Sequence, residues 1–427
     1  MSRTSTAPRR DLSTSCGCAV PARRGRDTGI WTKSLLTWMR QSLRLRLRLR
    51  LRHRTPFGQE LRMVRFGIEE EFMLLDHRAL APIPDGSSIR SALKHNLAQS
   101  VLEGSPVGGV ISPEFLDCQM EFSTSPSESL FSAGTELAGF RNNLGNFARQ
   151  INLVAGCVGT PYGSARSSSV TPDIRYDTIA NLMGGLTGEH FVNGLHVHTE
   201  VRDPEDRVRA LNAVRPWLPV LLALTANSPF WRRQDSGFAS WRSIQLRRLA
   251  TMWCPPIFHD FEDYQHRIDR LVQMDAAVDR GTISWAARLS ENYNTVEVRL
   301  FDAQLQVKDT LFAAALTRAI IIDQPSTVPL GAEEIDASLW MAARKGMHSH
   351  LVDPITGDVI DAWAIAERLL STLANSLTAH QDDAFVEERA AFVRESGTGA
   401  DRQRDARSRH GFAGLRALIG RGTTVEF

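Results

Sequence analysis

Three consecutive glutamates, Glu69, Glu70 and Glu71, lie in an otherwise apolar segment that runs from Phe66 to Leu75. A β-strand turns successive side chains to opposite faces, so Glu69 and Glu71 share one face while Glu70 lies on the other. Two carboxylates on one face can bind a hard divalent cation through their oxygen atoms. A solvated edge strand, whose charges discourage aggregation, explains the segment equally well. If the cation site exists, we expect replacement of Glu69 to be damaging and replacement of Glu70 to be mild.

Three further segments that read as strands, 114–123, 194–201 and 295–301, also carry polar residues two positions apart. The pairs are Gln119 and Glu121, His196 and His198, and Glu297 and Arg299. Each pair alone is explained by satisfied strand histidines or by a cross-strand ion pair. Their joint occurrence predicts one polar sheet face, whose buried charges must be paired or bound to metal. The His-x-His spacing is also typical of zinc hydrolases, but the abundance of oxygen ligands favours magnesium or manganese.

An arginine in a turn rich in hydroxyl groups is the next candidate. Asn227 is followed by the segment 235–242, Asp-Ser-Gly-Phe-Ala-Ser-Trp-Arg, which contains Ser236 and ends at Arg242. A guanidinium beside hydroxyl groups suits a carboxylate or a phosphate, because it can donate two parallel hydrogen bonds. A turn with a surface arginine is the alternative interpretation.

The charge of the chain is distributed unevenly. Of its 427 residues, residues 1–62 hold 15 basic and three acidic side chains, whereas residues 63–427 hold 35 basic and 45 acidic ones. The acidic main body is not an obvious nucleic-acid binder and fits a site that recruits cations. The five cysteines of the whole chain include no Cys-x-x-Cys pair, which favours a reduced, cytoplasmic setting. No run reaches the roughly 18 apolar residues that a spanning helix needs, so no membrane segment is predicted.

The first 62 residues read as a basic, low-complexity extension in which leucine and arginine alternate from Leu43 to Arg52. A basic arm for nucleic acid or an anionic membrane surface is one interpretation. An organelle transit peptide is another, because the segment is rich in arginine and poor in acids. We favour a disordered extension or a misplaced start codon, since Met63 immediately precedes the ordered pattern. Residues 63–427 are predicted to form one domain.

The spacing of apolar residues in the rest of the chain predicts the helices and strands that must hold the polar face. Helices are predicted over 91–102, 128–155, 206–224, 310–322 and much of 361–420, with Pro216 and Pro219 interrupting the third. Strands separated by helices of irregular length indicate the α+β class with an antiparallel sheet. No Gly-x-x-x-x-Gly-Lys phosphate loop occurs, so a bound nucleotide would be held by another device.

In their order along the chain, these segments resemble the glutamate–cysteine ligase type 2 family, the bacterial carboxylate–amine ligases, from about Val64 to Thr423. The motifs are Phe-Gly-Ile-Glu-Glu-Glu-Phe at 66–72, Gln-Met-Glu-Phe-Ser-Thr at 119–124, Gly-Leu-His-Val-His at 194–198, Arg-Pro-Trp-Leu-Pro at 215–219, Ala-Asn-Ser-Pro-Phe-Trp at 226–231, Asp-Ser-Gly-Phe-Ala-Ser at 235–240, Asn-Thr-Val-Glu-Val-Arg at 294–299 and Gly-Thr-Gly-Ala-Asp-Arg-Gln-Arg at 397–404. Any one of these motifs is weak evidence, whereas the ordered set is specific.

The resemblance implies a fold similar to the catalytic domain of glutamine synthetase, with a curved antiparallel sheet and helices packed on its outer face. ATP and two or three magnesium ions would bind the concave face. By motif, the resemblance assigns metal binding to Glu69, Glu71, Glu114, Glu121, His196 and Glu297. It assigns phosphate contact and catalysis to Arg299 together with Glu297, and substrate or ATP binding to Arg242, Asn227 and Ser236.

The activity that the resemblance implies is an ATP-dependent ligation. ATP phosphorylates the γ-carboxylate of glutamate, and an amine, nominally that of cysteine, displaces the phosphate. A loop near 230–245 would act as a lid, because the acyl phosphate must be shielded from water. The partners are small molecules, not nucleic acid or membrane, and homo-oligomerisation stays open. Departures from the family pattern at Leu249–Cys254 and at Thr199 bear on substrate specificity.

Two alternatives remain at this stage. One is a nucleotide-binding relative without catalytic activity, which loss of a metal ligand would favour; none of the motif acids is missing. The other is a zinc hydrolase that uses His196 and His198 as ligands.

Overall fold

A computed structural model describes residues 63–83, 86–102, 108–164 and 169–424. The interpretations of residues 1–62 lie outside these ranges and stay predictions. Within the described residues, no helix is both long enough and apolar enough to cross a bilayer.

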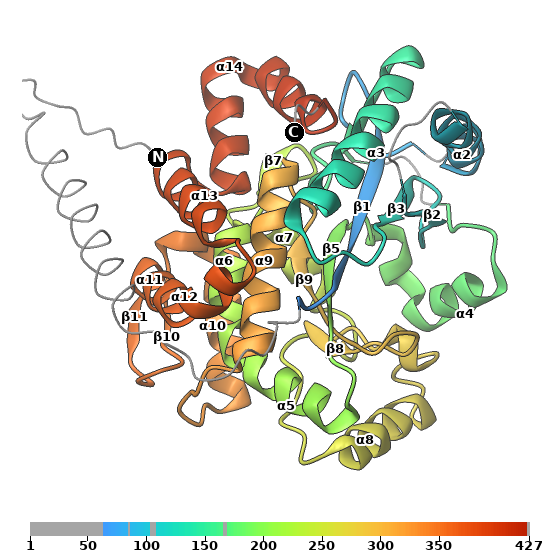
Figure 1. Cartoon of the computed structure of the whole chain (residues 1–427). Helices are drawn as coiled ribbons and strands as arrows, with labels where there is room; N and C mark the ends of the chain where they lie inside the picture. Colours follow the sequence, from blue (N-terminus) through green and yellow to red (C-terminus); the bar gives the residue numbers. More distant parts are fainter. Residues whose placement is uncertain (1–62, 84–85, 103–107, 165–168, 425–427) are drawn as a thin grey trace, which may run out of the picture. The chain divides into compact units, whose positions relative to one another are not determined.

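A seven-stranded antiparallel sheet forms the centre of the described part (Figure 1). The strand order is β2-β3-β1-β5-β9-β8, and β4 pairs with the second half of β1. The strands are β1 (Phe66–Asp76), β2 (Val110–Pro113), β3 (Gln119–Ser123), β4 (Leu153–Gly156), β5 (Gly194–Glu200), β8 (Ala287–Leu289) and β9 (Thr295–Asp302). The predicted α+β class with an antiparallel sheet is thereby confirmed.

One face of this sheet is apolar and covered by helices. The residues of β1 that precede and follow the glutamates at two-residue intervals, Phe66, Ile68, Phe72 and Leu74, are all buried. They belong to the same core as the side chains of α3 (Leu130–Gln150) and α9 (Val307–Asp323). Fourteen of the 17 residues of α9 are buried, which is typical of a helix surrounded by protein on all sides.

The helical segment after β5 is interrupted where proline was expected to interrupt it. It consists of α5 (Pro204–Val214), the 3₁₀ turn η2 (Arg215–Trp217) and α6 (Leu218–Thr225). Pro216 and Pro219 lie at the first positions of η2 and α6, where a missing backbone N–H costs no helical hydrogen bond.

Several boundaries differ from prediction, among them the start of α2 (Gly86–Leu102), which was predicted at 91, and two of the differences have a clear local cause. The helix predicted to reach 155 ends at Gln150, because Asn152 takes a positive φ of 59° and reverses the chain into β4. The strand predicted from Glu114 begins only at Gln119, because a turn at Asp117 and Cys118 intervenes.

The remaining elements surround this centre. Two small hairpins pair β6 (Phe230–Trp231) with β7 (Gln234–Asp235), and β10 (His350–Val352) with β11 (Val359–Asp361). The other helices are α2 (Gly86–Leu102), α4 (Ile174–Met183), η1 (Gly184–Glu189), α7 (Trp241–Leu246), α8 (Phe261–Gln273), η3 (Arg280–Thr282), α10 (Ala332–Lys345), η4 (Gly346–His348), α11 (Ala362–Thr372), α12 (Ala374–Ala379), α13 (Asp383–Ser396) and α14 (Gly399–Arg421).

Candidate active site

The second face of the sheet carries the polar residues that the sequence placed two apart. In the strand register, Glu69 lies opposite His196, Glu71 lies opposite Glu121, and Glu297 is paired with His198. Because β1 lies between β3 and β5, its two outer glutamates meet side chains from both neighbours. The alternation inferred from sequence therefore brings this predicted set together.

The distances within this set suit metal ligands. Nδ1 of His196 lies 3.1 Å from Oε2 of Glu69, and Nε2 of His196 lies 3.5 Å from Oε1 of Glu71. Nε2 of His198 lies 3.3 Å from Oε1 of Glu69. Ligand atoms within 4.8 Å of one another define three groups: Glu69, His198 and Glu297; Glu69, Glu121 and His196; and Glu71, Glu114 and Glu121.

The carboxylates in these groups carry more negative charge than their surroundings compensate. Burial and the nearby charge of Glu71 raise the pKa of Glu114 to about 8. Burial and the charge of Glu69 raise the pKa of Glu121 well above its usual value. Burial also opposes ionisation of Glu69 itself, but hydrogen bonds with His196 and His198 outweigh it and lower that pKa. A bound divalent cation would supply the missing positive charge.

Glu297 is held from two sides by arginines. Nε of Arg288 on β8 donates to Oε2 of Glu297 at 2.8 Å, and Arg299 on β9 forms a second ion pair with it. Although burial disfavours the charge, these two guanidinium groups lower the pKa of Glu297 well below its usual value. The two arginines therefore favour the ionised form of Glu297, which joins the metal-ligand groups to the arginines.

A cavity of about 980 Å³ lies over this face. Seven predicted site residues line it: Glu69, Glu71, Glu114, Glu121, His196, Arg242 and Arg299. Glu297 lies behind this lining, against Arg288 and Arg299. The volume is at the upper end of the usual range for small-molecule sites, roughly 300–1,000 Å³, and suits more than one ligand.

Arg242 enters the cavity as a buried cation that forms an ion pair with no carboxylate among the described residues. Its guanidinium donates to the carbonyl oxygens of Leu300 at 3.1 Å and Arg299 at 3.3 Å, and its Nε has no acceptor. Burial lowers its pKa. The backbone N–H of Arg242 donates to Ser228 Oγ, which donates to the buried carboxylate of Asp302 at 2.8 Å. This network fixes the start of α7, and the cation it presents suits an anionic ligand group.

Two predicted substrate residues lie away from the cavity, and we correct them here. The side chain of Asn227 is buried, and its Nδ2 donates to the carbonyl oxygens of Ala303 at 2.6 Å and Cys157 at 3.2 Å. Ser236 Oγ donates to the carbonyl of Pro229 at 2.9 Å across the open end of the β6–β7 hairpin. Both side chains are used by the fold, and of the predicted lid at 230–245 only Arg242 lines the cavity.

The prediction for Glu70 also needs correction. It lies on the face opposite the cavity, as predicted, but it is fully buried and forms an ion pair with the equally buried Arg141. A mild effect of replacing Glu70 therefore no longer follows, because the change leaves a buried guanidinium without its counterion.

Some lining residues were missed by the sequence analysis. Tyr176, His190 and Arg248 come from α4, the segment after η1, and the turn after α7, where no strand-like alternation marks them. Burial and nearby arginines lower the pKa of His190 to about 4. Arg288 did have a signal, because it lies between Ala287 and Leu289 in an apolar–polar–apolar triplet close to the Glu297 strand.

Comparisons with known sequences identify the family of this chain. A model described as glutamate-cysteine ligase family 2 (GCS2) matches residues 65–418. The chain is 33% identical over 365 residues to a candidate glutamate–cysteine ligase 2-1 of Nocardia farcinica, covering 84% of this chain and 92% of that one. It is 32% identical over 370 residues to a candidate glutamate–cysteine ligase 2-2 of Saccharopolyspora erythraea, with the same coverage of both chains.

Solved structures share the fold at low sequence identity. A glutamate–cysteine ligase of Francisella tularensis, solved in complex with AMP, matches with a TM-score of 0.63 and 13% identity, over 84% of this chain and 88% of that one. A bifunctional glutathione synthetase of Pasteurella multocida matches with a TM-score of 0.60 and 15% identity, over 84% of this chain and 52% of that one. By its family match and its relatives, the chain belongs to glutamate–cysteine ligase family 2 and is an ATP-dependent carboxylate–amine ligase.

Proposed function

We propose that this enzyme joins the γ-carboxylate of glutamate to an amine, with cysteine as the nominal acceptor, through an acyl phosphate. The proposal rests mainly on one observation. Three overlapping groups of metal-capable side chains lie on one sheet face, beside the two cavity-lining arginines Arg242 and Arg299. Negatively charged substrates and phosphates require such a combination of cations and cation-binding acids.

The donor set fits magnesium or manganese better than zinc. Glu69, Glu71, Glu114, Glu121 and Glu297 offer carboxylate oxygens, and His196 and His198 offer imidazole nitrogens. None of the three groups found among the described residues contains a cysteine. Hard divalent ions prefer such oxygen-rich sites. When bound, the ions would neutralise charge on the phosphates of ATP and on the carboxylate that attacks them.

The protein side chains divide the remaining work. Arg299 would contact the phosphoryl group during transfer, and Glu297 would hold Arg299 in place through their ion pair. Arg242 would bind the α-carboxylate of glutamate, because it is a buried cation in the cavity without a carboxylate partner. Asn227 and Ser236 take no part, since their side chains are occupied within the fold.

The reaction has two displacements. An oxygen of the γ-carboxylate attacks the γ-phosphorus of ATP, and ADP leaves with the electrons of the broken P–O bond. The acceptor nitrogen then attacks the acyl carbon, phosphate leaves, and the nitrogen loses a proton to give the amide. The substrates are small soluble molecules, and we expect the enzyme to act in the cytoplasm.

Phosphate release from ATP, measured across pairs of glutamate with candidate amines in the presence of Mg²⁺ or Mn²⁺, tests the proposal. We expect at least one pair to release phosphate in proportion to the amide detected by mass spectrometry. Glu71→Gln should abolish this release. If no pair exceeds background and Glu71→Gln changes nothing, the proposal is wrong. Tightly bound stoichiometric zinc in the purified protein would favour a hydrolase instead.

A further inference from the structure

A buried ion pair lies directly behind the acidic strand. The carboxylate of Glu70 accepts from Nε of Arg141 at 2.9 Å and from its Nη2 at 2.6 Å, and Thr310 Oγ1 donates to the same carboxylate. Both charged side chains are fully buried. Glu70 comes from β1, Arg141 from α3 and Thr310 from α9, so the pair joins three elements of the core.

Arg141 also reaches the segment that connects β9 to α9. It donates to the carbonyl oxygens of Gln304 at 3.0 Å, Leu305 at 3.2 Å and Gly422 at 3.1 Å. We name this set of contacts, from Glu70 through Arg141 to residues 304, 305, 310 and 422, the buried brace. On the helix-covered side of the sheet, it links the middle of β1 to the segment that follows β9.

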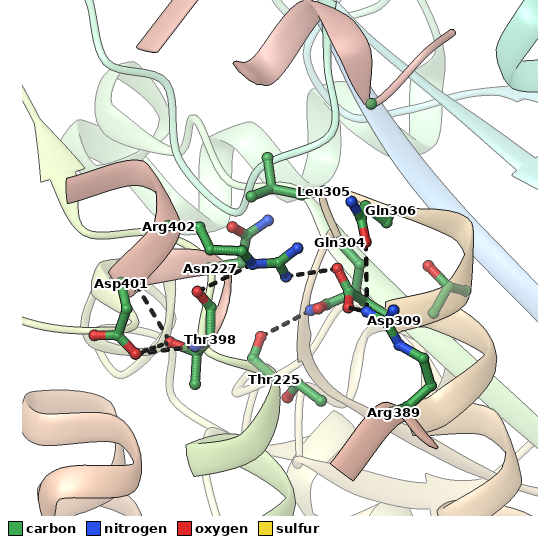
Figure 2. Close-up of polar contacts among 12 residues, drawn as sticks. Thr225, Asn227, Gln304, Leu305, Gln306, Asp309, Arg389, Thr398, Asp401 and Arg402 are labelled. Carbon is green, nitrogen blue, oxygen red and sulfur yellow. Dashed lines mark hydrogen bonds and ion pairs between the residues drawn. The ribbon is translucent and has the colours of Figure 1, made fainter. Parts of the chain in front are cut away.

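The far end of the brace is itself fixed by other polar contacts (Figure 2). Gln304 Nε2 donates to the carbonyl of Thr225 at 2.7 Å. Asp309, at the first turn of α9, forms ion pairs with Arg389 of α13 and with Arg402 of α14, the latter at 2.7 Å. The 303–310 segment is therefore held against α6, α13 and α14, so it can act as a rigid anchor for β1.

The position of the brace matters because the metal-capable groups span three strands. Glu69 comes from β1, His198 from β5 and Glu297 from β9, and β5 lies between the other two strands. Hydrogen bonds between neighbouring strands fix each adjacent pair, but nothing in the ladder joins β1 directly to β9. The brace connects β1 to residues 304 and 305, which directly follow β9 in the chain.

Stability alone does not explain such a pair. Removing two charges from water costs about as much as their attraction returns, and well-packed apolar residues often replace a buried pair without loss. A buried pair does supply directed contacts that apolar residues lack, here seven donor–acceptor contacts at stated atoms. The ion pair in the core is therefore better explained by the positions in which it fixes its neighbouring elements than by a gain in stability.

We propose that Glu70 and Arg141 are positioning residues that set the spacing between Glu69 and Glu71 on β1 and Glu297 and Arg299 on β9. The middle glutamate of the triplet thus serves the same site as its neighbours, from the opposite side of the sheet. This inference rests on the proposed metal site, and the following experiment distinguishes a failure of the inference from a failure of the metal site.

The test compares the double variant Glu70→Gln/Arg141→Met with the unmodified protein. Calorimetry measures Mn²⁺ binding to each ATP-free protein, and urea unfolding gives the midpoint for each. This variant removes both charges, so no buried ion is left without a partner. We expect a urea midpoint close to that of the unmodified protein and Mn²⁺ affinity weaker by about tenfold or more, as is usual when support for metal ligands is lost. Arg141→Lys, which keeps the charge but loses the planar fork, should show a similar loss.

A matched control is available on α9, the helix that carries Thr310. Arg318 of α9 forms an ion pair with Asp382, with side chains only 1% and 5% exposed, and its other hydrogen bonds within the described residues go to the carbonyl oxygens of Val64 and Glu128. Arg318→Met/Asp382→Asn should leave Mn²⁺ affinity unchanged. Unchanged affinity in folded Glu70→Gln/Arg141→Met and in Arg141→Lys would overturn the inference alone. Absence of Mn²⁺ binding by the unmodified protein would contradict the proposed metal site and the brace with it.

Discussion

Arg288 holds both oxygens of Glu297 from the neighbouring strand, with Nε 2.8 Å from Oε2 and Nη2 3.3 Å from Oε1. The same guanidinium donates to the carbonyl of Ile283 at 2.9 Å. The edge strand β8 therefore fixes the orientation of an acid that also belongs to a metal-capable group and pairs with Arg299.

Arg288→Lys should lower kcat about tenfold or more while the protein stays folded. An ammonium keeps the positive charge but cannot bind both carboxylate oxygens and a carbonyl in one plane. Steady-state kinetics with saturating ATP measures the effect. Arg267→Lys is the matched control, because Arg267 pairs with Asp263 on the exposed surface of α8, and it should be silent. Equal kinetics for the two variants would contradict the role of Arg288.

Arg242→Met should raise the KM for glutamate by about 10- to 100-fold, the usual worth of a charge-assisted hydrogen bond. Its free energy of unfolding should fall little or even rise, since the variant removes a buried charge that has no carboxylate partner. Kinetics and urea unfolding of the same preparation check both halves. A large loss of stability with unchanged KM would show that Arg242 supports only the fold.

Mg²⁺ should stabilise the protein, because it binds the folded ligand groups and not the unfolded chain. At about 100 times its dissociation constant, a single bound ion adds about 2.7 kcal/mol to the free energy of unfolding. Thermal unfolding with and without Mg²⁺ measures this shift. Glu71→Gln should reduce it, whereas Glu136→Gln on α3, outside the cavity, should not. A shift that persists in Glu71→Gln would place the ion elsewhere.

The low pKa of His190 predicts acid sensitivity. Its folded pKa of about 4 lies below the ordinary value of about 6.5, so the unfolded chain takes up the proton first as pH falls. The contribution of His190 to the free energy of unfolding is intact above about pH 6.5. It is lost between about pH 6.5 and 4, at up to about 1.4 kcal/mol per pH unit. Urea unfolding at pH 7, 5.5 and 4.5 should show a shallower decline for His190→Gln than for the unmodified protein. Parallel declines would contradict the assignment.

Much of the polar face could be predicted because strand alternation is a local property. The two-residue spacing placed Glu69, Glu71, Glu121 and His196 on one face, and the structure brings them within ligand distance. The same alternation put Glu70 on the other face but could not reveal its partner. Arg141 is 71 residues away, in a helix whose apolar spacing gives no sign of a buried cation.

Asn227 shows why a polar residue in a motif cannot be assigned as a ligand contact from the sequence alone. A buried backbone carbonyl needs a donor as much as a substrate does, and the carbonyls of Cys157 and Ala303 receive theirs from Asn227. Its own oxygen accepts from Gln403, in a motif that precedes the end of the chain by two dozen residues. Only the tertiary structure shows that the motifs at 226–231 and 397–404 form hydrogen bonds with each other.

The contact between Arg141 and the carbonyl of Gly422 has a consequence for biosynthesis. The acidic strand at 66–76 leaves the ribosome long before Gly422 is translated, yet the guanidinium that neutralises Glu70 completes its contacts only with Gly422. Until then, the nascent chain carries a core carboxylate and a core cation whose surroundings are unfinished. The catalytic face should therefore mature after translation has passed α14, and a chain stalled before Gly422 should be a substrate for chaperones rather than an early enzyme.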